Sequence, residues 1–547
     1  MRRILDFARA GRAPWILAAV VSACLSFLAV WFGGLNQDEG WYLYAAQMVR
    51  AGKLPFRDFF YTQGPAMPIV YSVLAPVWGM DSPLHGLLGG RLLTLVLGFL
   101  ATACAVALVR RLVPPGRRGV AGLSVFAMLA CNIYHLYFTT IPKTYSLGSL
   151  FVLAGLLPIA CALIPSHGAF RLGARAKVCL VLGGLSLAFA TGTRISLLLI
   201  LPVVGFTLLV RFRDFRWSFI WFGLGGALGL FLTYGLFALD PISLRALLTA
   251  QHYHAARGGF DPFFALGSVS RLARGYAALG VILFAAACLR PVPVPSGPVS
   301  GGGQTDAGAP GRSALRWILG LGFASVFLLQ LSAPFPYDDY QVPVMGMLTV
   351  LIVSGFVSRG SARGRGWFAV LAACLVSFSS PLLQEWATYG PDRFWNHKKE
   401  QTELAKLRDA GREIEAVDPG GKTIFTQDLY LAIETGRTVP AGMEMGPFCY
   451  FPEMPTEEAR AVHVLNRTLM DDLIRTNACR VAACSGYAFA IAVPTCDEVP
   501  FEEQKHFFEA LKRNYRLVDS VPKFGQNATT LLILAKSDAS EREASAK

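Results

Sequence analysis

The sequence predicts a mainly α-helical protein, in which a polytopic transmembrane helix bundle precedes a smaller α/β or α+β domain. Of the 547 residues, 54% are hydrophobic and 16% are charged, whereas an ordinary soluble domain is about 25% charged. Long apolar stretches recur up to about residue 385 and then stop. We therefore expect a membrane module at residues 1–385 and a soluble domain at residues 386–547.

About eleven segments are long and apolar enough to be candidate spans, since a spanning helix needs about 20 mostly apolar residues. Several are short, and the fifth and sixth are separated by only a few residues. Gly225 and Gly229, inside the seventh, form a small-x-x-x-small pattern that predicts close helix packing. The candidates are Pro14–Leu35, Leu84–Leu108, Gly119–Tyr134, Thr144–Ile164, Val178–Thr191, Ile195–Val210, Trp217–Leu239, Tyr276–Leu289, Trp317–Ala333, Gln341–Val357 and Trp367–Leu383.

The distribution of basic residues predicts the orientation of these spans. Lysine and arginine accumulate in loops on the cytoplasmic side. With the N-terminus placed inside, the inside loops hold 20 lysines and arginines and three acids. The net charge of +14 therefore reports topology and does not indicate a nucleic-acid partner. An odd number of spans places residues 386–547 outside the cytoplasm.

The first outside loop, residues 36–83, is long and carries two apolar stretches. Asp38 and Glu39 stand where the chain leaves the first span, and apolar side chains from Trp41 to Val49 recur at helical spacing. This pattern predicts a short amphipathic helix on the membrane surface. The second stretch, Ala66–Met80, is short for a span and predicts an interfacial or re-entrant helix.

The C-terminal domain shows patterns of both strands and helices. We expect strands at Thr423–Thr426 and Thr529–Leu534, and amphipathic helices at Thr456–Arg475 and Phe501–Tyr515. Four cysteines in a domain placed outside could form two disulfides. These cysteines are Cys449, Cys479, Cys484 and Cys496.

One further group of residues could form a metal site, although this is the less favoured interpretation. His252 and His254, with Asp261 nearby, could ligate a metal if they lay on a strand. We favour ordinary interfacial or groove-lining residues in an outside loop. The sequence thus predicts no cofactor and no metal ligand set, while a divalent ion is left open.

Placing a charged residue at the membrane edge costs free energy, and such residues are functional candidates for that reason. The pair Asp38-Glu39 is the most prominent, since a carboxylate between a span and an interfacial helix could act as a general base. The competing reading is an N-cap for the following helix.

Short motifs surround that acidic pair. They are Asp38-Glu39-Gly-Trp-Tyr-Leu-Tyr-Ala-Ala, Gly52-Lys-Leu-Pro55, Asp58-Phe-Phe, Gly64-Pro65 and Arg91-Leu-Leu. Together they resemble the first external loop of GT-C glycosyltransferases, and within that class the protein-mannosyltransferase, aminoarabinose-transferase and lipopolysaccharide-core transferase group. The resemblance is best over residues 14–210, continues loosely to about 385 and fades in the C-terminal domain.

The resemblance implies an enzyme that takes a sugar from a polyprenyl-phosphate carrier on the outer face of the membrane. It would pass the sugar to a lipid, glycan or protein hydroxyl, usually with inversion, in a bacterial inner membrane. Asp38 maps onto the base, and Glu39 would help to orient the substrate. Tyr42, Asp58 and Tyr61 of the same loop are candidate substrate-binding residues.

A lipid phosphate that leaves needs cations rather than an acid. Arg91, Lys143 and Arg194 are the candidates, and the competing reading of each is a snorkelling cation at a helix end. The related aminoarabinose transferases carry an acid near the second outside turn, where this chain has Lys143. Asp338 or Asp339 could supply that carboxylate, unless the two simply form a solvated turn.

Two other functions remain open on the sequence. A transporter or lipid flippase would show paired repeats and broken helices with charge near the midplane. A structural or sensing protein would work through residues 386–547 and would not need Asp38-Glu39. Ionisable residues at the outside edge, and the lack of a G-x-x-x-x-G-K-[ST] motif, favour the transferase over an ATP-driven pump.

Overall fold

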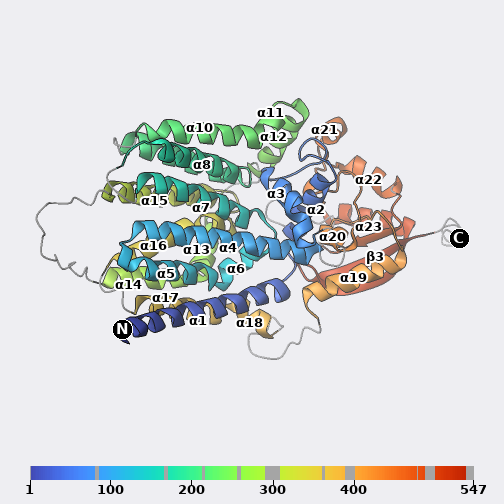
Figure 1. Cartoon of the computed structure of the whole chain (residues 1–547). Helices are drawn as coiled ribbons and strands as arrows, with labels where there is room; N and C mark the ends of the chain where they lie inside the picture. Colours follow the sequence, from blue (N-terminus) through green and yellow to red (C-terminus); the bar gives the residue numbers. More distant parts are fainter. Residues whose placement is uncertain are drawn as a thin grey trace, which may run out of the picture.

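The computed structural model describes a multi-pass membrane protein whose helix bundle carries a small domain at one end (Figure 1). Within the described residues, seven helices are long and apolar enough to cross a membrane, or up to nine if each of two bent pairs is one span. The described residues are 2–80, 86–165, 170–211, 216–255, 260–289, 308–359, 364–388, 401–476, 478–486 and 499–537.

Every one of the predicted span ranges contains helical structure, although the count of eleven spans stays a prediction. The helices are α1 (Arg2–Phe32), α4 (Gly86–Leu112), α5 (Arg118–Ala130), α7 (Thr144–Leu163), α8 (Ala174–Thr191), α9 (Ile200–Phe206), α10 (Ser218–Leu230), α14 (Ala277–Cys288), α15 (Ala309–Leu331), α16 (Val342–Ser358) and α17 (Arg365–Phe378). A 3-10 turn, η3 (Ile195–Leu199), precedes α9, and α11 (Leu236–Ala238) extends the line of α10.

Shorter helices bend the chain at the edges of the bundle. The pair of α5 and α6 (Ile133–Thr140) is bent by 65°, and the pair of α13 (Pro262–Gly275) and α14 by 74°. The remaining two are α12 (Pro241–Ala255) and α18 (Pro381–Thr388). The boundary expected at residue 385 therefore falls inside a helix.

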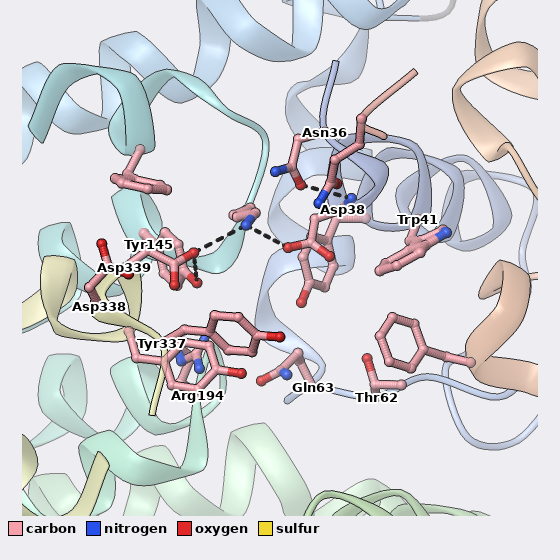
Figure 2. Close-up of a pocket in the computed structure, with 16 residues that line it drawn as sticks. Asn36, Asp38, Trp41, Thr62, Gln63, Tyr145, Arg194, Tyr337, Asp338 and Asp339 are labelled. Carbon is pink, nitrogen blue, oxygen red and sulfur yellow. Dashed lines mark hydrogen bonds and ion pairs between the residues drawn. The ribbon is translucent and has the colours of Figure 1, made fainter. Parts of the chain in front are cut away.

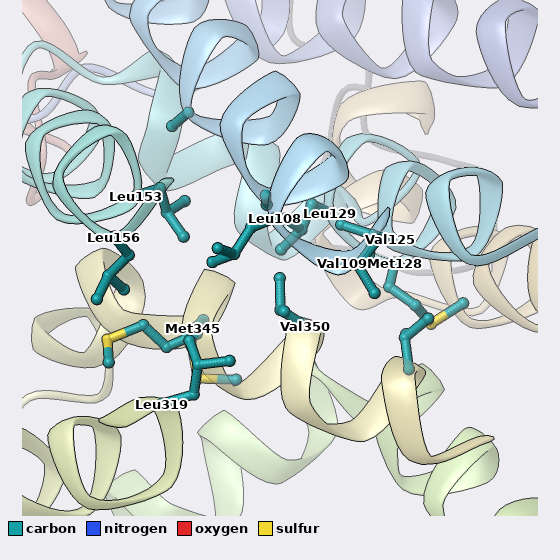
Figure 3. Packing of buried hydrophobic residues seen from close by; sticks show 14 of the residues in the cluster. Leu108, Val109, Val125, Met128, Leu129, Leu153, Leu156, Leu319, Met345 and Val350 are labelled. Carbon is teal, nitrogen blue, oxygen red and sulfur yellow. The ribbon is translucent and has the colours of Figure 1, made fainter. Parts of the chain in front are cut away.

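The interior of the bundle is packed almost entirely with aliphatic side chains (Figure 3). Helices α4, α5, α7, α15 and α16 meet there, through Leu108, Val109, Val125, Met128, Leu129, Leu153, Leu156, Leu319, Met345 and Val350. Since lipid tails are as apolar as these side chains, close packing rather than exclusion from water holds such helices together.

Glycines allow α8 and α10 to approach very closely. A Cβ added at Gly225 would lie 2.0 Å from the carbonyl oxygen of Val181, and one at Gly229 would lie 2.5 Å from Cβ of Ala188. The close packing predicted from the small-x-x-x-small pattern is therefore confirmed, with α8 as the partner helix.

The first outside loop is helical but it does not lie on an open surface. Helix α2 (Gln37–Arg50) and helix α3 (Ala66–Leu74), which continues as η1 (Ala75–Trp78), form where the sequence predicts them. Most side chains of α2, including Trp41 and Tyr44, are buried. The surface position expected for α2 is wrong, because the C-terminal domain covers the helix and shares one hydrophobic core with it.

In its described residues, the C-terminal domain combines short helices with a three-stranded antiparallel sheet in the order β1-β3-β2. Its strands are β1 (Val481–Cys484), β2 (Tyr515–Phe524) and β3 (Thr529–Lys536). Its helices are α19 (Glu403–Val417), α20 (Leu429–Thr435), η8 (Gly446–Cys449), α21 (Thr456–Ala461), α22 (Arg467–Thr476) and α23 (Phe501–Asn514). The strand at Thr529 and the helix at Phe501 are thus confirmed.

Two of the elements expected there differ. Residues 423–426 make single bridges at Thr423 and Phe425 and no named strand, and the latter bridge lies beside β1. The helix expected over Thr456–Arg475 is broken into α21 and α22 by a turn in which His463 has φ of 60°. That left-handed conformation cannot continue a right-handed helix.

The predicted disulfides are not found among the described cysteines. Among the described residues no disulfide involves Cys449, Cys479 or Cys484, and all three are buried, while Cys496 lies outside the described residues. Each sits in the apolar core that the domain shares with α2, so each behaves as a small hydrophobic side chain.

Candidate active site

A cavity of about 280 Å³ lies where α2, two outside turns of the bundle and the C-terminal domain meet (Figure 2). Several parts of the chain that are far apart in sequence build its wall. The lining residues are Asn36, Asp38, Trp41, Tyr42, Thr62, Gln63, Phe138, Lys143, Tyr145, Arg194, Tyr337, Asp338, Asp339, Tyr340, Phe448 and Gln526.

Asp38 is placed in this cavity by the way α2 begins. The side chain of Asn36 accepts a hydrogen bond from the backbone N–H of Asp38 at 3.1 Å. In return the backbone N–H of Asn36 donates to Oε1 of Glu39 at 3.0 Å. This capping box makes Asn36 the N-cap, so the N-cap reading of Asp38 is wrong. The Asp38 carboxylate is left free to face the cavity.

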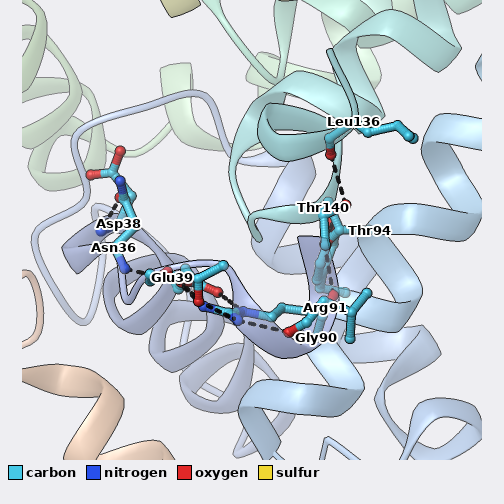
Figure 4. A network of polar contacts seen from close by, with 12 residues as sticks. Asn36, Asp38, Glu39, Gly90, Arg91, Thr94, Leu136 and Thr140 are labelled. Atoms are coloured by element: carbon cyan, nitrogen blue, oxygen red, sulfur yellow. Dashed lines mark hydrogen bonds and ion pairs between the residues drawn. The ribbon is translucent and has the colours of Figure 1, made fainter. Parts of the chain in front are cut away.

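Glu39 and Arg91 form a buried ion pair behind the cavity (Figure 4). The guanidinium donates to both carboxylate oxygens, from Nε at 2.6 Å and from Nη2 at 2.7 Å. It also donates to three backbone carbonyls at the end of α1, those of Val30, Gly33 and Gly34. The pair therefore ties α1, α2 and α4 together, and the structure brings neither side chain to the cavity wall.

Lys143 bridges two carboxylates at the cavity. Its Nζ lies 2.7 Å from Oδ2 of Asp38 and 3.2 Å from Oδ2 of Asp339. The hydroxyl of Tyr145 donates to the same oxygen of Asp339 at 2.8 Å. Burial lowers the pKa of Lys143, but Asp38, Tyr145 and Asp339 outweigh that effect and hold the pKa well above its ordinary value. The lysine is therefore charged.

Arg194 lies on the same side of the cavity. Its guanidinium stands over the rings of Tyr145 and Tyr340, at 5.1 and 4.5 Å from their centroids. One of its nitrogens donates to the hydroxyl of Thr144 at 3.5 Å. Among the residues that the structure describes, its Nε is buried and has no hydrogen-bond partner.

Asp338 is engaged by residues of the bundle. Tyr134 donates a hydrogen bond to its Oδ2, and Nε of Arg271 lies 3.0 Å from its Oδ1. The carboxylates of Asp338 and Asp339 have fixed partners, so the reading of these residues as a solvated turn is wrong. The two aspartates open the 3-10 turn η7 (Asp338–Gln341) just before α16.

The other predicted site residues of the first loop are placed differently. Tyr42 lines the cavity. Tyr61 is fully buried behind it, with its ring 6.1 Å from that of Tyr42. Asp58 is exposed and accepts a hydrogen bond from the backbone N–H of Leu54 at 2.7 Å, so it stabilises a turn outside the cavity.

The strand that a metal site at His252 and His254 would require is not present at these residues. His252 and His254 lie on helix α12 (Pro241–Ala255) instead. The carboxylate of Asp261 caps α13 by accepting from the N–H groups of Phe263 and Phe264. Within the described part of the chain, no three His, Cys, Asp or Glu side chains are grouped to hold a metal ion.

The sequence analysis did not identify the residues that the C-terminal domain contributes to the wall of the cavity. Phe448 lies in η8 and Gln526 lies in the turn between β2 and β3, and both line the cavity. Gln526 accepts a hydrogen bond from the backbone N–H of Gln37 across the whole length of the chain. A weaker signal existed for Thr62 and Gln63, since they stand directly before the Gly64-Pro65 motif.

The glycine of that motif explains why Thr62 and Gln63 reach the cavity. A Cβ at Gly64 would lie 2.3 Å from the carbonyl oxygen of Gly192, so only glycine permits this approach. The N–H of Ala66 donates to the same carbonyl at 2.9 Å. The contact joins the first loop to the turn that carries Arg194.

Comparisons with known proteins identify the fold. No protein-family model and no curated protein sequence matches the chain. Two crystal structures of ArnT from Cupriavidus metallidurans match with a TM-score of 0.62 each, one bound to undecaprenyl phosphate at 12% identity and one in the apo state at 14%. Both alignments cover 96% of this chain and 98% of the ArnT chain.

A third match is to the oligosaccharyltransferase of Archaeoglobus fulgidus in its apo form, with a TM-score of 0.48 and 12% identity. It covers 95% of this chain and 74% of that chain. The identities are low throughout, and the fold rests on the two ArnT structures. The chain has the fold of the GT-C glycosyltransferase ArnT over nearly its whole length.

Proposed function

We propose that this protein is an integral membrane glycosyltransferase that moves a sugar from a polyprenyl-phosphate-linked donor to a lipid, glycan or protein hydroxyl. The observation that carries the proposal is one cavity shared by a carboxylate, Asp38, and two cations, Lys143 and Arg194. These are the groups that such a transfer needs, a base for the acceptor and positive charge for the leaving phosphate.

Asp38 is the general base of the proposed reaction. Its carboxylate removes the proton of the acceptor hydroxyl while the oxygen bonds to the anomeric carbon. The bond from that carbon to the phosphate oxygen breaks, and its electron pair leaves with the lipid phosphate. Lys143 and Arg194 stabilise the charge that develops there, and an in-line attack of this kind inverts the anomeric centre.

Glu39 and Asp339 act on these groups indirectly. Glu39, held by Arg91, fixes the start of α2 and with it the position of Asp38. Asp339 receives Lys143 and Tyr145, and so orients the ammonium group toward the cavity. Both are positioning residues in this proposal. A transition state gains most from charges that are oriented before the reaction starts.

The carrier class follows from the fold and the site together. One of the ArnT structures is bound to undecaprenyl phosphate, which is a lipid phosphate of the kind that the two cations of this cavity would bind. The excess of lysine and arginine in the inside loops supports an extracytoplasmic position for the cavity and the C-terminal domain. We accordingly propose a bacterial inner membrane as the location, with the N-terminus in the cytoplasm.

The test is the release of undecaprenyl phosphate from labelled undecaprenyl-phosphate sugars, with cell-envelope extract as acceptor. Membranes would carry the wild type, Asp38→Asn or the matched control Asp58→Asn at equal levels. General-base catalysis contributes about 10²–10⁴-fold, so Asp38→Asn should lose at least 100-fold while the control keeps its rate.

Full turnover in Asp38→Asn would refute the assignment of the base. If the wild type releases carrier from none of a panel of neutral, amino and acidic sugar donors, the transferase proposal fails and a transporter or flippase becomes the better reading.

A further inference from the structure

The cavity has two chemically different halves, as Figure 2 shows. Asp339, Arg194 and Tyr145 gather on one side of Asp38, Trp41 and Thr62 lie on the other, and Gln63 lies between Arg194 and Thr62. Among the described residues that line the cavity, those on the second side have no ionisable side chain. We call it the neutral half, and it comprises Asn36, Trp41, Thr62, Gln63, Phe448 and Gln526.

Polar groups of the neutral half retain hydrogen-bonding capacity. Thr62 is only 4% exposed, and the structure describes no intramolecular partner for its hydroxyl or for the amide of Gln63. Gln526 accepts from Gln37 through Oε1, which leaves its amide nitrogen as a donor. Asn36 uses Oδ1 for the helix cap in the same way. Because the described residues of the protein do not use these donors and acceptors, they are available to a ligand in the cavity.

Two aromatic rings complete the wall of the neutral half. Trp41 and Phe448 meet edge to face at 88°, with their centroids 4.5 Å apart. Ring faces carry a partial negative charge that attracts the weakly positive C–H groups of a sugar ring. Amides and a hydroxyl beside aromatic rings form a surface that matches the alternating O–H and C–H groups of a pyranose.

We propose that the neutral half binds the transferred sugar, and that this sugar is an uncharged, hydroxyl-rich hexose. The inference rests on the proposed transferase function and adds its substrate class. With the lipid phosphate at Lys143 and Arg194, the attached sugar extends past Asp38 into the neutral half. An amino or carboxylate substituent there would be desolvated without an opposite charge, which is strongly unfavourable.

The C-terminal domain thereby becomes a determinant of specificity. Phe448 and Gln526 come from that domain, whereas the phosphate-binding cations come from the bundle. Substitutions in the neutral half should accordingly change the preference among sugars and leave binding of the lipid phosphate unchanged. This separation distinguishes a sugar site from a wall that only supports the fold.

The experiment measures binding to the full-length protein in lipid nanodiscs. The probes are undecaprenyl phosphate alone and undecaprenyl phosphate that carries a neutral hexose, a 4-aminopentose or a hexuronic acid. The wild type should bind the neutral hexose donor at least 10-fold more tightly than either charged donor. Thr62→Val and Gln526→Ala should each weaken only the neutral hexose donor, by roughly 2- to 10-fold, the usual effect of one hydrogen bond.

Gln504→Ala, in the same domain but outside the cavity lining, is the matched control and should change nothing. Gln526→Glu supplies the missing opposite charge and should raise the relative affinity for the aminopentose donor. Equal or tighter binding of a charged donor by the wild type would overturn the inference. So would variants that lose bare carrier and glycosylated carrier equally, because that result indicates a structural role.

Two further outcomes separate the sources of failure. Variants that raise the KM for the acceptor without changing donor affinity would show that the neutral half binds the acceptor. That result would refute the donor-sugar assignment but not the transferase proposal. If neither bare nor glycosylated carrier binds the wild type, the proposed function fails together with the inference. Binding of all carriers with no sugar preference refutes the inference and leaves the transferase proposal standing.

Discussion

The ammonium nitrogen of Lys143 lies 2.7 Å from the carboxylate of Asp38, although the two residues stand in different outside loops of the bundle. The side chain of Lys143 is 8% exposed and that of Asp38 is 26% exposed, so the pair borders the cavity instead of lying deep in the core. This contact couples the proposed base to the cation that would receive the leaving phosphate. It makes Lys143 the first residue to test.

Removing Lys143 should abolish most sugar transfer. Lys143→Ala takes away a preorganised charge aimed at the leaving group, and such losses reach about 10²–10³-fold in rate. Lys143→Arg keeps the charge and should recover part of the rate. The measurement is the initial rate of carrier release, with Lys53→Ala, an exposed lysine outside the cavity, as control. An unchanged rate in Lys143→Ala would remove the lysine from the mechanism.

Arg91 should determine stability rather than donor affinity. Its side chain is 1% exposed and that of Glu39 is 0% exposed, and breaking such a pair leaves a buried charge that costs about 3–5 kcal/mol. Arg91→Lys should also destabilise, since an ammonium cannot reproduce a bidentate guanidinium that also reaches three carbonyls. Thermal unfolding in detergent would measure this, with exposed Arg57→Ala as control. A stable Arg91→Lys with a raised donor KM would restore the phosphate-binding role.

Glu444 should make the C-terminal domain less stable as pH rises. The side chain is 3% exposed, and burial raises the pKa of Glu444 from 4.5 to about 7. A carboxyl whose pKa is raised in the folded state binds more protons there than in the unfolded state. Its contribution is thus complete below pH 4.5 and is lost as pH rises through 7, by about 3 kcal/mol.

The variant Glu444→Gln stays neutral and should flatten this pH dependence. Unfolding temperatures of the wild type and the variant would be compared between pH 5 and pH 8. Exposed Glu509→Gln serves as the control and should keep the slope of the wild type. Equal slopes in all three proteins would show that Glu444 does not titrate in this range.

Gln37 should couple the C-terminal domain to the rate of transfer. Its Nε2 donates to Oδ1 of the buried Asp428 at 2.7 Å, and its backbone N–H donates to Gln526 at 3.0 Å. The domain therefore holds the residue directly before Asp38. Gln37→Ala should lower kcat about 10-fold with a small change in donor KM, because a small displacement of a reacting group slows catalysis strongly.

Gln47→Ala, on the same helix but outside the cavity lining, is the matched control for Gln37→Ala. The unfolding temperature separates positioning from stability, since Gln37→Ala should lose rate while the domain remains folded. Unchanged kcat in Gln37→Ala would mean that the bundle alone positions Asp38.

Much of the fold could be predicted from the sequence because a membrane strongly restricts the local structure of the chain. An apolar run of about 20 residues has few alternatives to a helix in lipid, and helical structure is found in each predicted range. Helix α2 was readable from its apolar spacing as well. Its burial was not, since the same apolar face serves equally for a lipid surface and for a covering domain.

The sequence by itself determined the membrane bundle, the two helices of the first outside loop and several residues of the candidate site. Asp38, Tyr42, Lys143, Arg194, Asp338 and Asp339 were named from charge at the membrane edge or from the family resemblance, and all six line the cavity. Arg91 and Glu39 were named because charged residues near a membrane often have a function. In the structure, however, the two side chains form an ion pair with each other. A pattern shows that a charge needs a partner and not which one it has.

Only the tertiary structure decided what surrounds Asp38. The Gln526 contact with Gln37 and the approach of Gly64 to Gly192 join segments that no local pattern connects. The C-terminal strands and their order were equally hidden, since short strands are specified by the partners they pair with. Local sequence sets which residues are able to react, and long-range packing selects which of them share one cavity.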